Sequence, residues 1–438
     1  MLDRIRKHAK TGVKVQNLAY LINDKSITFT HQRMDGKKAV GVDRVTKEEY
    51  STNLERNVSM LISRMKRQAY KPQPTRRTYI DKPGSNKKRP LGISCYEDKL
   101  VENRVAELLN AVYEPKFYDS SFGFRPKKNC HNAVREVIEL TQYRKTSYIV
   151  EADIRSFFDR IDHEWLMKFL EHDIADKRFL EIIWNMLKAG IMEQGTLFDH
   201  EVGSPQGNGA SPILANVYLH YVLDMWFEKV VKKQSKGQAY LVRYADDFVC
   251  CFQYQNEAQA FYEELPKRFA KFGLELAEEK TRILEFGRFA TENRAKRGDG
   301  KPETFDFLGF TFYCSEGSVE GKKFFYRTKV KSCRKNITAK LKKLNQWLKE
   351  NRHLKEELLM KRVNQSLVGH YHYYGVTDNY WSIGQFCNYV KALIFKWLNR
   401  RSQKKSFTWE TFQKGFLQTF PIAIPKTYVS LFYIKSNG

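Results

Sequence analysis

The sequence predicts a mixed α/β or α+β fold whose last part is helical and strongly basic. Apolar runs of strand length alternate with long amphipathic helical patterns over about the first 320 residues, which is typical of a mixed fold. After Lys329 the pattern becomes mainly helical. Of the 438 residues, 42% are hydrophobic and 14% aromatic, which excludes a disordered or fibrous chain, and the length allows about three domains.

The positive charge is concentrated at the end of the chain. The net charge is +26, from 76 Lys and Arg against 50 Asp and Glu, and a charge of this size indicates a polyanionic partner such as nucleic acid. Residues 321–438 contain 24 Lys and Arg against 5 Asp and Glu, a net +19, whereas the first 320 residues carry only +7. This asymmetry suggests a catalytic body of mixed charge followed by a basic clamp.

Cysteine usage and the N-terminal residues bear on the compartment. The seven cysteines form no CxxC pair, so neither a zinc site nor a disulfide framework is indicated. No apolar region of the secretory type follows MLDRIRKHAK, and no stretch combines membrane-spanning length with sustained apolarity. We therefore expect a soluble protein of the reducing cytoplasm, the bacterial cytoplasm or nucleoid.

Two long helices are predicted in the first 320 residues. Over 97–112, apolar residues recur on one helical face. A second helix is predicted from Ser211, the expected N-cap, with Pro212 at the first helical position.

Strands are predicted at 148–154 and 241–252, both apolar runs interrupted by acids. In the tail, apolar stripes over 337–348 and 386–398 predict two more helices.

The acids that interrupt the two strands are the strongest chemical signal. Asp153 closes YIVEAD, and Asp246 and Asp247 lie in the middle of LVRYADDFVCCF. Adjacent like charges in an apolar setting are costly unless a cation neutralises them. If the residues on either side of the acid pair form a hairpin, the pair lies at its tip, where a neighbouring strand that ends at Asp153 meets it.

Three convergent carboxylates favour oxygen-ligated Mg²⁺ over zinc. Two such ions about 4 Å apart suit phosphoryl transfer, one activating a 3′-hydroxyl and the other stabilising the leaving pyrophosphate. The alternative is that Asp246 and Asp247 are ordinary turn residues.

Several further blocks occur in a fixed order between residues 36 and 425. They are GKKAVGVDRVT (36–46), RRTYIDKPGSNKKRPLGI (76–93), SFGFRPKKNCHNAV (121–134), EADIRSFFDRIDH (151–163), GSPQGNGASPILANVYLH (203–220), YADD (244–247), GLELAEEKTRI (273–283), FDFLGFTFY (305–313), VNQSLVGHYHYYGV (363–376) and WLNRRSQKKSFTWETF (397–412). Together these blocks resemble those of group II intron-encoded reverse transcriptases with a maturase domain. Blocks 151–163, 203–220, 244–247 and 273–283 are similar to motifs A, B, C and D of that family.

The resemblance implies a right-hand polymerase in three parts. Residues 1–145 would form an N-terminal extension and the fingers, 146–320 a palm with an antiparallel sheet, and 321–438 a helical thumb and maturase domain that binds RNA. It also implies an enzyme that copies RNA into DNA with two Mg²⁺ ions, for which Mn²⁺ is a possible substitute. No His/Cys endonuclease domain follows the tail in the sequence, so priming would use an existing DNA end or nick.

The same resemblance implies roles for individual residues near the predicted metals. Asp153, Asp246 and Asp247 would hold the metal ions, with Ile154, the residue after Asp153, also placed in the metal set. Phe158 matches the aromatic steric gate that excludes a 2′-hydroxyl, although a plain core Phe is the alternative.

Three polar residues correspond to groups that contact the nucleotide. Lys82 and Arg89 match the finger cations that bind the triphosphate, but nearby lysines leave open which one reaches inward. Gln206 corresponds to a contact with nucleotide or template; without the resemblance its block would be interpreted as a turn and a helix start.

Lys280 matches a motif D lysine that protonates pyrophosphate, with a plain surface lysine as the alternative. The sequence departs from the usual family pattern at Arg155, where Lys is common, and at Asn208-Gly209-Ala210 in motif B. Neither departure involves the metal carboxylates, and we expect any effect to fall on template grip, fidelity or terminal transfer.

Basic residues of the tail are candidate RNA contacts, with a solvated charged face as the alternative. These candidates are Lys342, Lys343, Arg400, Arg401, Lys404 and Lys405. Expected partners are an RNA template, a DNA primer, dNTPs and group II intron RNA, and a homodimer is conceivable. Two other functions fit the same sequence: a non-catalytic splicing cofactor, and a domesticated polymerase acting in DNA repair or phage defence.

Overall fold

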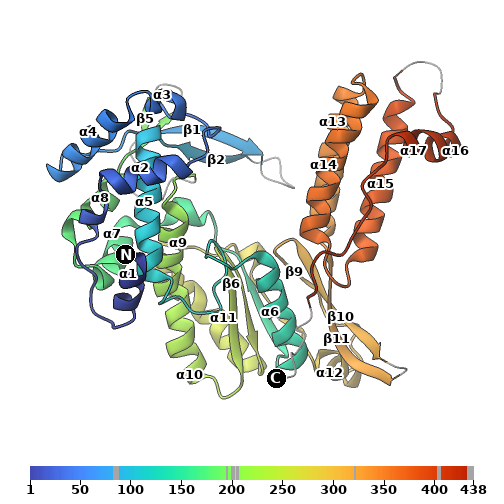
Figure 1. Ribbon diagram of the computed structural model, residues 1–438. Coiled ribbons are helices and arrows are strands. Elements are labelled where there is room, and N and C mark those ends of the chain that lie inside the picture. The colour runs from blue at the N-terminus through green and yellow to red at the C-terminus, as the bar shows by residue number, and fades with distance from the viewer. Residues whose placement is uncertain are drawn as a thin grey trace. The chain divides into compact units, whose positions relative to one another are not determined.

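The computed structural model describes residues 1–81, 88–193, 196–198, 203, 207–319, 322–401 and 406–431. It divides into two compact units (Figure 1). Unit 1 contains Met1–Ile80, Lys88–Ala133 and Ile149–Ile283, and the larger part of unit 2 contains Val134–Tyr148 and the chain from Leu284 onward. The division into residues 1–145, 146–320 and 321–438 stays a prediction.

Helix α5 (Tyr96–Tyr113) runs through unit 1, and three other helices pack along it (Figure 1). Its side chains Leu100, Val105 and Leu108 are fully buried, which confirms the helix predicted over 97–112. Each such side chain contributes about 1.5–3 kcal/mol of hydrophobic stabilisation. The three neighbours are α1 (Leu2–Ala9), α2 (Asp24–Arg33) and α9 (Ser211–Leu219).

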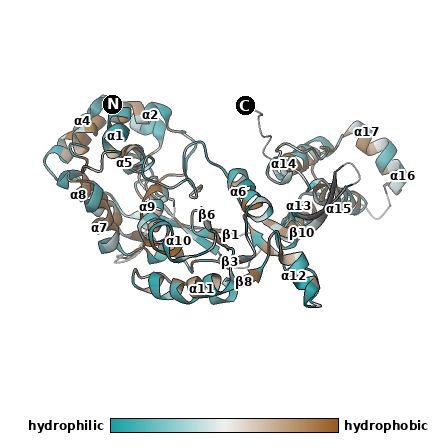
Figure 2. Ribbon diagram, turned by 90° about the horizontal axis from the view of Figure 1, so that it is seen from below, coloured by the Kyte–Doolittle hydropathy of each residue, from teal (hydrophilic) through white to brown (hydrophobic). Residues whose placement is uncertain are grey.

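The longer of the remaining helices of unit 1 are amphipathic. Figure 2 shows that α7, α8 and α11 carry both hydrophilic and hydrophobic residues, as expected for helices with one face on the core. The remaining helices of unit 1 are α3 (Lys47–Ser51), α4 (Leu54–Lys66), α7 (His163–Asp173), α8 (Lys177–Leu187), α10 (Lys232–Gln234) and α11 (Gln255–Ala270).

Helix α9 differs from its prediction at the first residue. The N-cap is Ala210 rather than Ser211, and no side chain caps the helix in that position. The reason lies one step earlier, since the Asn208 side chain accepts the Ala210 N–H at 2.8 Å and forms the turn that precedes the helix. Beyond Leu219 the helical path continues through π-helical stretches, His220–Asp224 and Phe227–Val231, to α10.

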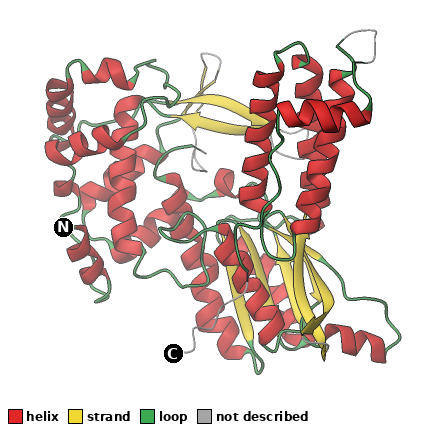
Figure 3. Ribbon diagram, turned by 45° about the vertical axis from the view of Figure 1, so that its right-hand side comes forward, coloured by secondary structure: helices red, strands yellow, loops and turns green. Residues whose placement is uncertain are grey.

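A four-stranded sheet, called here the YADD sheet, has the strand order β6-β7-β3-β8. Strands β6 (Ala239–Tyr244) and β7 (Asp247–Phe252) form the antiparallel hairpin predicted from the apolar run, and β3 (Tyr148–Ala152) is the other predicted strand. The edge strand is β8 (Arg282–Glu285). Figure 3 shows the strands in yellow with helices around them.

A second sheet has the order β2-β1-β4-β5. In it β1 and β4 are parallel, and β4 and β5 are antiparallel. Its strands are β1 (Thr75–Asp81), β2 (Lys88–Ile93), β4 (Ile191–Glu193) and β5 (Thr196–Phe198).

Unit 2 combines an antiparallel sheet of order β11-β10-β9 with long helices. Helices α13, α14 and α15 contact one another and lie side by side, which confirms the helical tail (Figures 1 and 3). The elements are α6 (Cys130–Tyr143), α12 (Ala290–Lys296), β9 (Phe305–Phe307), β10 (Phe310–Val319), β11 (Lys322–Ser332), α13 (Arg334–Asn351), α14 (Glu356–Tyr374), α15 (Tyr380–Leu398), α16 (Trp409–Thr411) and α17 (Leu417–Thr419).

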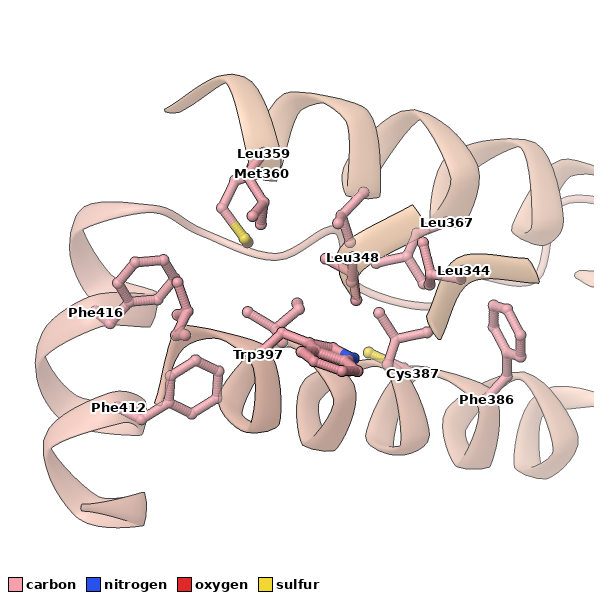
Figure 4. Close-up of a cluster of buried hydrophobic side chains, with 14 of the residues drawn as sticks. Leu344, Leu348, Leu359, Met360, Leu367, Phe386, Cys387, Trp397, Phe412 and Phe416 are labelled. Carbon is pink, nitrogen blue, oxygen red and sulfur yellow. The ribbon is translucent and has the colours of Figure 1, made fainter. Parts of the chain in front are cut away.

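One apolar cluster holds the helices of unit 2 together. Figure 4 shows side chains of α13, α14, α15 and the segment around Phe412 pointing toward one another. Leu348 and Val363 are fully buried in this cluster, and the Trp397 indole N–H donates to Asn345 at 2.9 Å. None of the helices in the described ranges is long and apolar enough to cross a membrane.

A histidine in α14 is buried without a hydrogen bond. The His370 side chain is 1% exposed, neither ring nitrogen has a partner, and the ring stacks on Phe386 with centroids 3.8 Å apart. Burial, with a smaller effect of the Lys340 charge, lowers the pKa of His370 to about 3. The folded helices therefore hold His370 as a neutral imidazole.

This burial predicts acid sensitivity. Between pH 6.5 and about 3 the unfolded chain takes up a proton at His370 that the folded chain does not, so stability falls as the pH falls. At pH 5 the loss from this group is about 2 kcal/mol. We expect His370→Leu to lose about that much less stability than the wild type between pH 7 and pH 5, measured by urea unfolding with tryptophan fluorescence. His372→Leu, an exposed neighbour on the same helix, is the control. An unchanged pH dependence in His370→Leu would contradict the assignment.

Candidate active site

The acid pair of YADD lies at the turn of the β6–β7 hairpin. β6 ends at Tyr244, β7 begins at Asp247, and these two residues pair in the antiparallel register. Ala245 and Asp246 form the turn, and Ala245 has a left-handed backbone with a φ of 56°. The Asp246 side chain is half-buried and Asp247 is exposed. Both acids thus lie at one end of the YADD sheet.

The segment before α6 runs beside this turn. Ser121 forms a parallel bridge with Arg243, and the Phe122 N–H donates to the Arg243 carbonyl at 2.8 Å. At Gly123 an added Cβ would lie 2.3 Å from the backbone nitrogen of Ala245, which is closer than any side chain tolerates. Glycine at this position therefore lets a second backbone pack directly against the YADD turn.

Asp153 follows β3 and is held by backbone pairing with the chain that precedes Lys280. The Asp153 carbonyl accepts the Ala277 N–H at 2.8 Å, and Ile154 forms an antiparallel bridge with Leu276. Ile154 itself is buried. This short pairing brings the 3-10 turn Glu278–Lys280 next to the end of β3.

Lys280 connects the two acidic segments. Its ammonium donates to the Asp153 carboxylate in an ion pair, in which the Asp153 side chain is 23% and the Lys280 side chain 52% exposed. The hydrogen bond to Asp153 is the main cause that raises the pKa of Lys280, and Asp153 and Asp247 both add attraction. Carboxylates from β3 and β7 therefore act on one positive charge.

The residue types at this point suit a divalent metal ion. Carboxylate oxygens are the ligands that Mg²⁺ prefers, and the shared ammonium indicates that the site attracts a cation. Within the part of the chain that the structure describes, no group of three or more His, Cys, Asp or Glu side chains is close enough to hold a metal. Lys280 forms an ion pair with Asp153 and is attracted by the charge of Asp247, and metal binding by all three carboxylates stays a prediction.

Comparison with known proteins identifies the family. Residues 80–312, slightly more than half of the chain, match the family described as reverse transcriptase (RNA-dependent DNA polymerase). The chain belongs to the reverse transcriptase family. The matched residues include Asp153, Lys280 and the YADD turn. The expected resemblance and the mixed fold with a helical C-terminal region are both confirmed.

The relatives of this reverse transcriptase include intron-encoded proteins. The group II intron-encoded protein LtrA of Lactococcus lactis subsp. cremoris is 29% identical over 343 residues, which cover 65% of this chain and 57% of LtrA. Protein YkfC of Escherichia coli is 33% identical over 270 residues, covering 54% of this chain and 71% of YkfC. An uncharacterized 91 kDa protein in the cob intron of Schizosaccharomyces pombe is 39% identical over 173 residues, covering 40% of this chain and 21% of that protein. The chain thus spans a little over half the length of LtrA.

Phe158 is partly exposed. It lies in the 3-10 turn Phe157–Arg160, where Phe157 is 2% exposed and Phe158 is half-buried. The two rings meet edge to face with centroids 5.4 Å apart. Phe157 thus packs in the core and leaves part of the Phe158 ring open, and the steric-gate role stays a prediction.

Several predicted contacts lie outside the described residues, and others are on the surface. Arg89 is exposed on β2. Arg155, the departure in motif A, pairs with Glu275 at 2.6 Å on the segment that supports Asp153. The predicted contacts outside the described ranges are Lys82, Gln206, Lys404 and Lys405.

One residue that supports motif B was missed by sequence reasoning. Glu102 on α5 is 3% exposed, and its carboxylate accepts the Gly209 N–H at 2.9 Å. Burial raises the pKa of Glu102 to about 7. Gly207, two residues before Gly209, has a φ of 116°, and a Cβ at Gly207 would lie 2.7 Å from the Gly92 carbonyl oxygen. An acid on the apolar face of a predicted helix was the signal available in the sequence.

The predicted RNA contacts of unit 2 differ in their surroundings. Lys342 and Lys343 are exposed on α13. Arg400 is exposed, and its guanidinium lies 5.4 Å from the Trp397 ring centroid. Arg401 instead pairs with Glu356 and donates to the Leu354 carbonyl at 2.8 Å. Arg401 therefore stabilises the helical unit, and the lysines of α13 have more freedom to contact phosphate.

The close approach at Gly123 yields a stability prediction. Gly123→Ala places a methyl group against the Ala245 nitrogen, and we expect a loss of about 1–3 kcal/mol from overpacking. Gly369→Ala is the matched control, because a Cβ at this exposed position of α14 meets nothing within 4 Å and should stabilise the helix by up to about 1 kcal/mol. Urea unfolding measures both. Equal stability of Gly123→Ala and wild type would show that the YADD turn moves aside freely.

Proposed function

We propose that this protein copies RNA into DNA by two-metal-ion nucleotidyl transfer and binds group II intron RNA to assist splicing and mobility. The observation that supports the catalytic part is that β3, which Asp153 follows, and β7, which begins at Asp247, are neighbouring strands of one sheet in a chain of the reverse transcriptase family. The names of LtrA and the other intron-encoded relatives support the intron part.

Asp153, Asp246 and Asp247 would hold two Mg²⁺ ions. When bound, these ions supply Lewis-acid activation of a 3′-hydroxyl and stabilise the leaving pyrophosphate. The protein contributes the positions of the three carboxylates, which lie at the end of β3 and at the β6–β7 turn. Phe158 limits the space beneath the sugar and selects deoxynucleotides, and Arg89, together with Lys82, binds the triphosphate.

Lys280 has two roles in this proposal. Without metal it neutralises Asp153, and its raised pKa keeps the ammonium protonated at neutral pH. With substrate bound it donates a proton to the departing pyrophosphate, as a cation next to developing phosphate charge is suited to do.

Unit 2 supplies the main RNA-binding surface. Residues 321–438 carry a net charge of +19, and helix α13 alone contributes six Lys and Arg against one Glu while its apolar side is packed in the cluster. Template RNA, primer DNA, dNTPs and intron RNA are all polyanions, and binding through lysine contacts to phosphate depends on salt.

A single substitution tests the catalytic part. We expect Asp246→Asn to abolish primer extension on an RNA template, because the neutral amide cannot replace a metal-binding carboxylate. RNA affinity, measured by filter binding, should stay close to that of the wild type. Asp3→Asn, the same change at an exposed position of α1, is the control. Extension by Asp246→Asn at the wild-type rate would refute the role of this residue, and an inactive wild type with normal RNA binding would favour a non-catalytic splicing cofactor.

The clamp is tested by salt dependence. We expect the double variant Lys342→Gln and Lys343→Gln to weaken RNA binding and to reduce the slope of log affinity against log salt by roughly one for each lost phosphate contact. The control is Lys296→Gln with Lys301→Gln, two exposed lysines of the same unit. If both double variants keep the wild-type slope, α13 does not contact RNA.

A further inference from the structure

Arg243 is the largest fully buried side chain among the residues that the structure describes, and it lies in β6, three residues before Asp246. A buried guanidinium is costly unless its N–H groups are paired. The side chain has no exposure to solvent, so every partner must come from the protein.

Four of its five N–H groups have identified partners. The Nε and Nη2 atoms donate to the two carboxylate oxygens of Asp224 at 2.7 Å each, and Asp224 is also fully buried. The Nη1 atom donates to the Asn216 Oδ1 and to the Ala245 carbonyl, each at 3.0 Å. The bidentate pair thus fixes the plane of the guanidinium, and the remaining edge is directed at the YADD turn.

Asn216 ties a second backbone segment into the same network. Its Nδ2 donates to the Gly123 carbonyl at 2.8 Å, and Gly123 is the residue that packs against Ala245. Asn216 is on α9 and Asp224 is on its π-helical continuation, so one helical path carries both side chains. The network therefore joins this helix to the two backbone segments that meet at the turn, one at Gly123 and the other at Ala245.

The turn needs such support because Ala245 is left-handed. An alanine at a φ of 56° is strained, and it stays there only when its surroundings fix it. A charged donor on its carbonyl and a glycine backbone against its nitrogen supply that constraint. Stability alone does not account for the choice of residues, because well-packed apolar side chains commonly replace a buried ion pair without loss.

We infer that Arg243, Asp224 and Asn216 are positioning residues that hold the Ala245 turn and thereby direct the carboxylates of Asp246 and Asp247. This inference rests on the proposed function for its consequence in catalysis. This hydrogen-bond network fixes the geometry of the backbone, and its residues contact neither substrate nor metal in the proposal. Its loss displaces the carboxylates without removing them.

Arg243→Lys tests the inference, because lysine keeps the charge but loses the planar set of donors. We expect kcat for primer extension to fall about tenfold or more while KM for dNTP stays within about twofold, since the defect is in the catalytic geometry. The Mn²⁺ affinity of the protein without nucleic acid, measured by electron paramagnetic resonance of free Mn²⁺, should fall about threefold or more.

The matched control is Arg104→Lys. Arg104 is 4% exposed and donates from Nε and Nη2 to the Leu21 carbonyl at 3.1 Å, away from the YADD turn. It should lower the melting temperature without changing kcat or Mn²⁺ affinity. If Arg243→Lys does not fold, Asn216→Ala serves instead, because it removes two hydrogen bonds of the network and keeps the Arg243–Asp224 ion pair.

The outcomes separate this inference from the proposed function. An inactive wild type refutes the polymerase proposal, and the Mn²⁺ affinities still decide the positioning role. The test variant is Arg243→Lys, or Asn216→Ala if the first does not fold. If its kcat and Mn²⁺ affinity equal those of the control Arg104→Lys, the network has a structural role only and the inference is overturned. A change in KM alone would likewise overturn it.

Discussion

The attraction between carboxylates and a cation at the end of the YADD sheet is the interaction on which the site depends. Asp153 and Asp247 come from different strands, and like charges brought together at a protein surface repel unless a positive charge lies between them. Lys280 pairs with Asp153 and is attracted by the charge of Asp247, and its segment is held in place by backbone pairing with residues 153–155. Folding of the sheet therefore brings the acids together and neutralises part of their charge in one step.

The backbone around the acids is shaped as closely as the side chains. Ala245 has a left-handed conformation, and Gly123 leaves no space for a side chain against it. In motif B, Gly207 has a positive φ and Gly209 donates its N–H to the buried Glu102. The YADD turn and the motif B loop are thus each held by a hydrogen bond with a buried charged residue, Arg243 at Ala245 and Glu102 at Gly209.

Local pattern was enough to predict the elements but not their tertiary partners. The strands around Asp153 and YADD were predictable because apolar runs interrupted by acids stand out, and α5 was predictable from its repeating apolar face. The predicted N-cap of α9 was wrong by one residue. The turn before the helix is made by the Asn208 side chain, whose hydrogen bond to the Ala210 N–H depends on the preceding loop.

Glu102 and Arg243 were missed for a different reason. Each is a charged residue within an apolar element, and its meaning depends on a partner far away in the sequence, Gly209 for Glu102 and Asp224 for Arg243. A single sequence gives the anomaly but not the partner. The roles of Lys82 and Gln206 are still inferred from the family resemblance alone.

The two cations near the YADD turn differ in a way that follows from burial. Lys280 is half exposed, so water can solvate its ammonium if it leaves Asp153, and a metal ion can take its place at modest cost. Arg243 has no exposure, and removing it from Asp224 would leave a buried charge without a partner. Lys280, which contacts the Asp153 carboxylate, can therefore be replaced by a metal ion. Arg243, which holds the backbone of the YADD turn, stays paired with Asp224. The proposed polymerase cycle, in which metal and pyrophosphate would bind and leave, would need both properties, and they are assigned to separate residues.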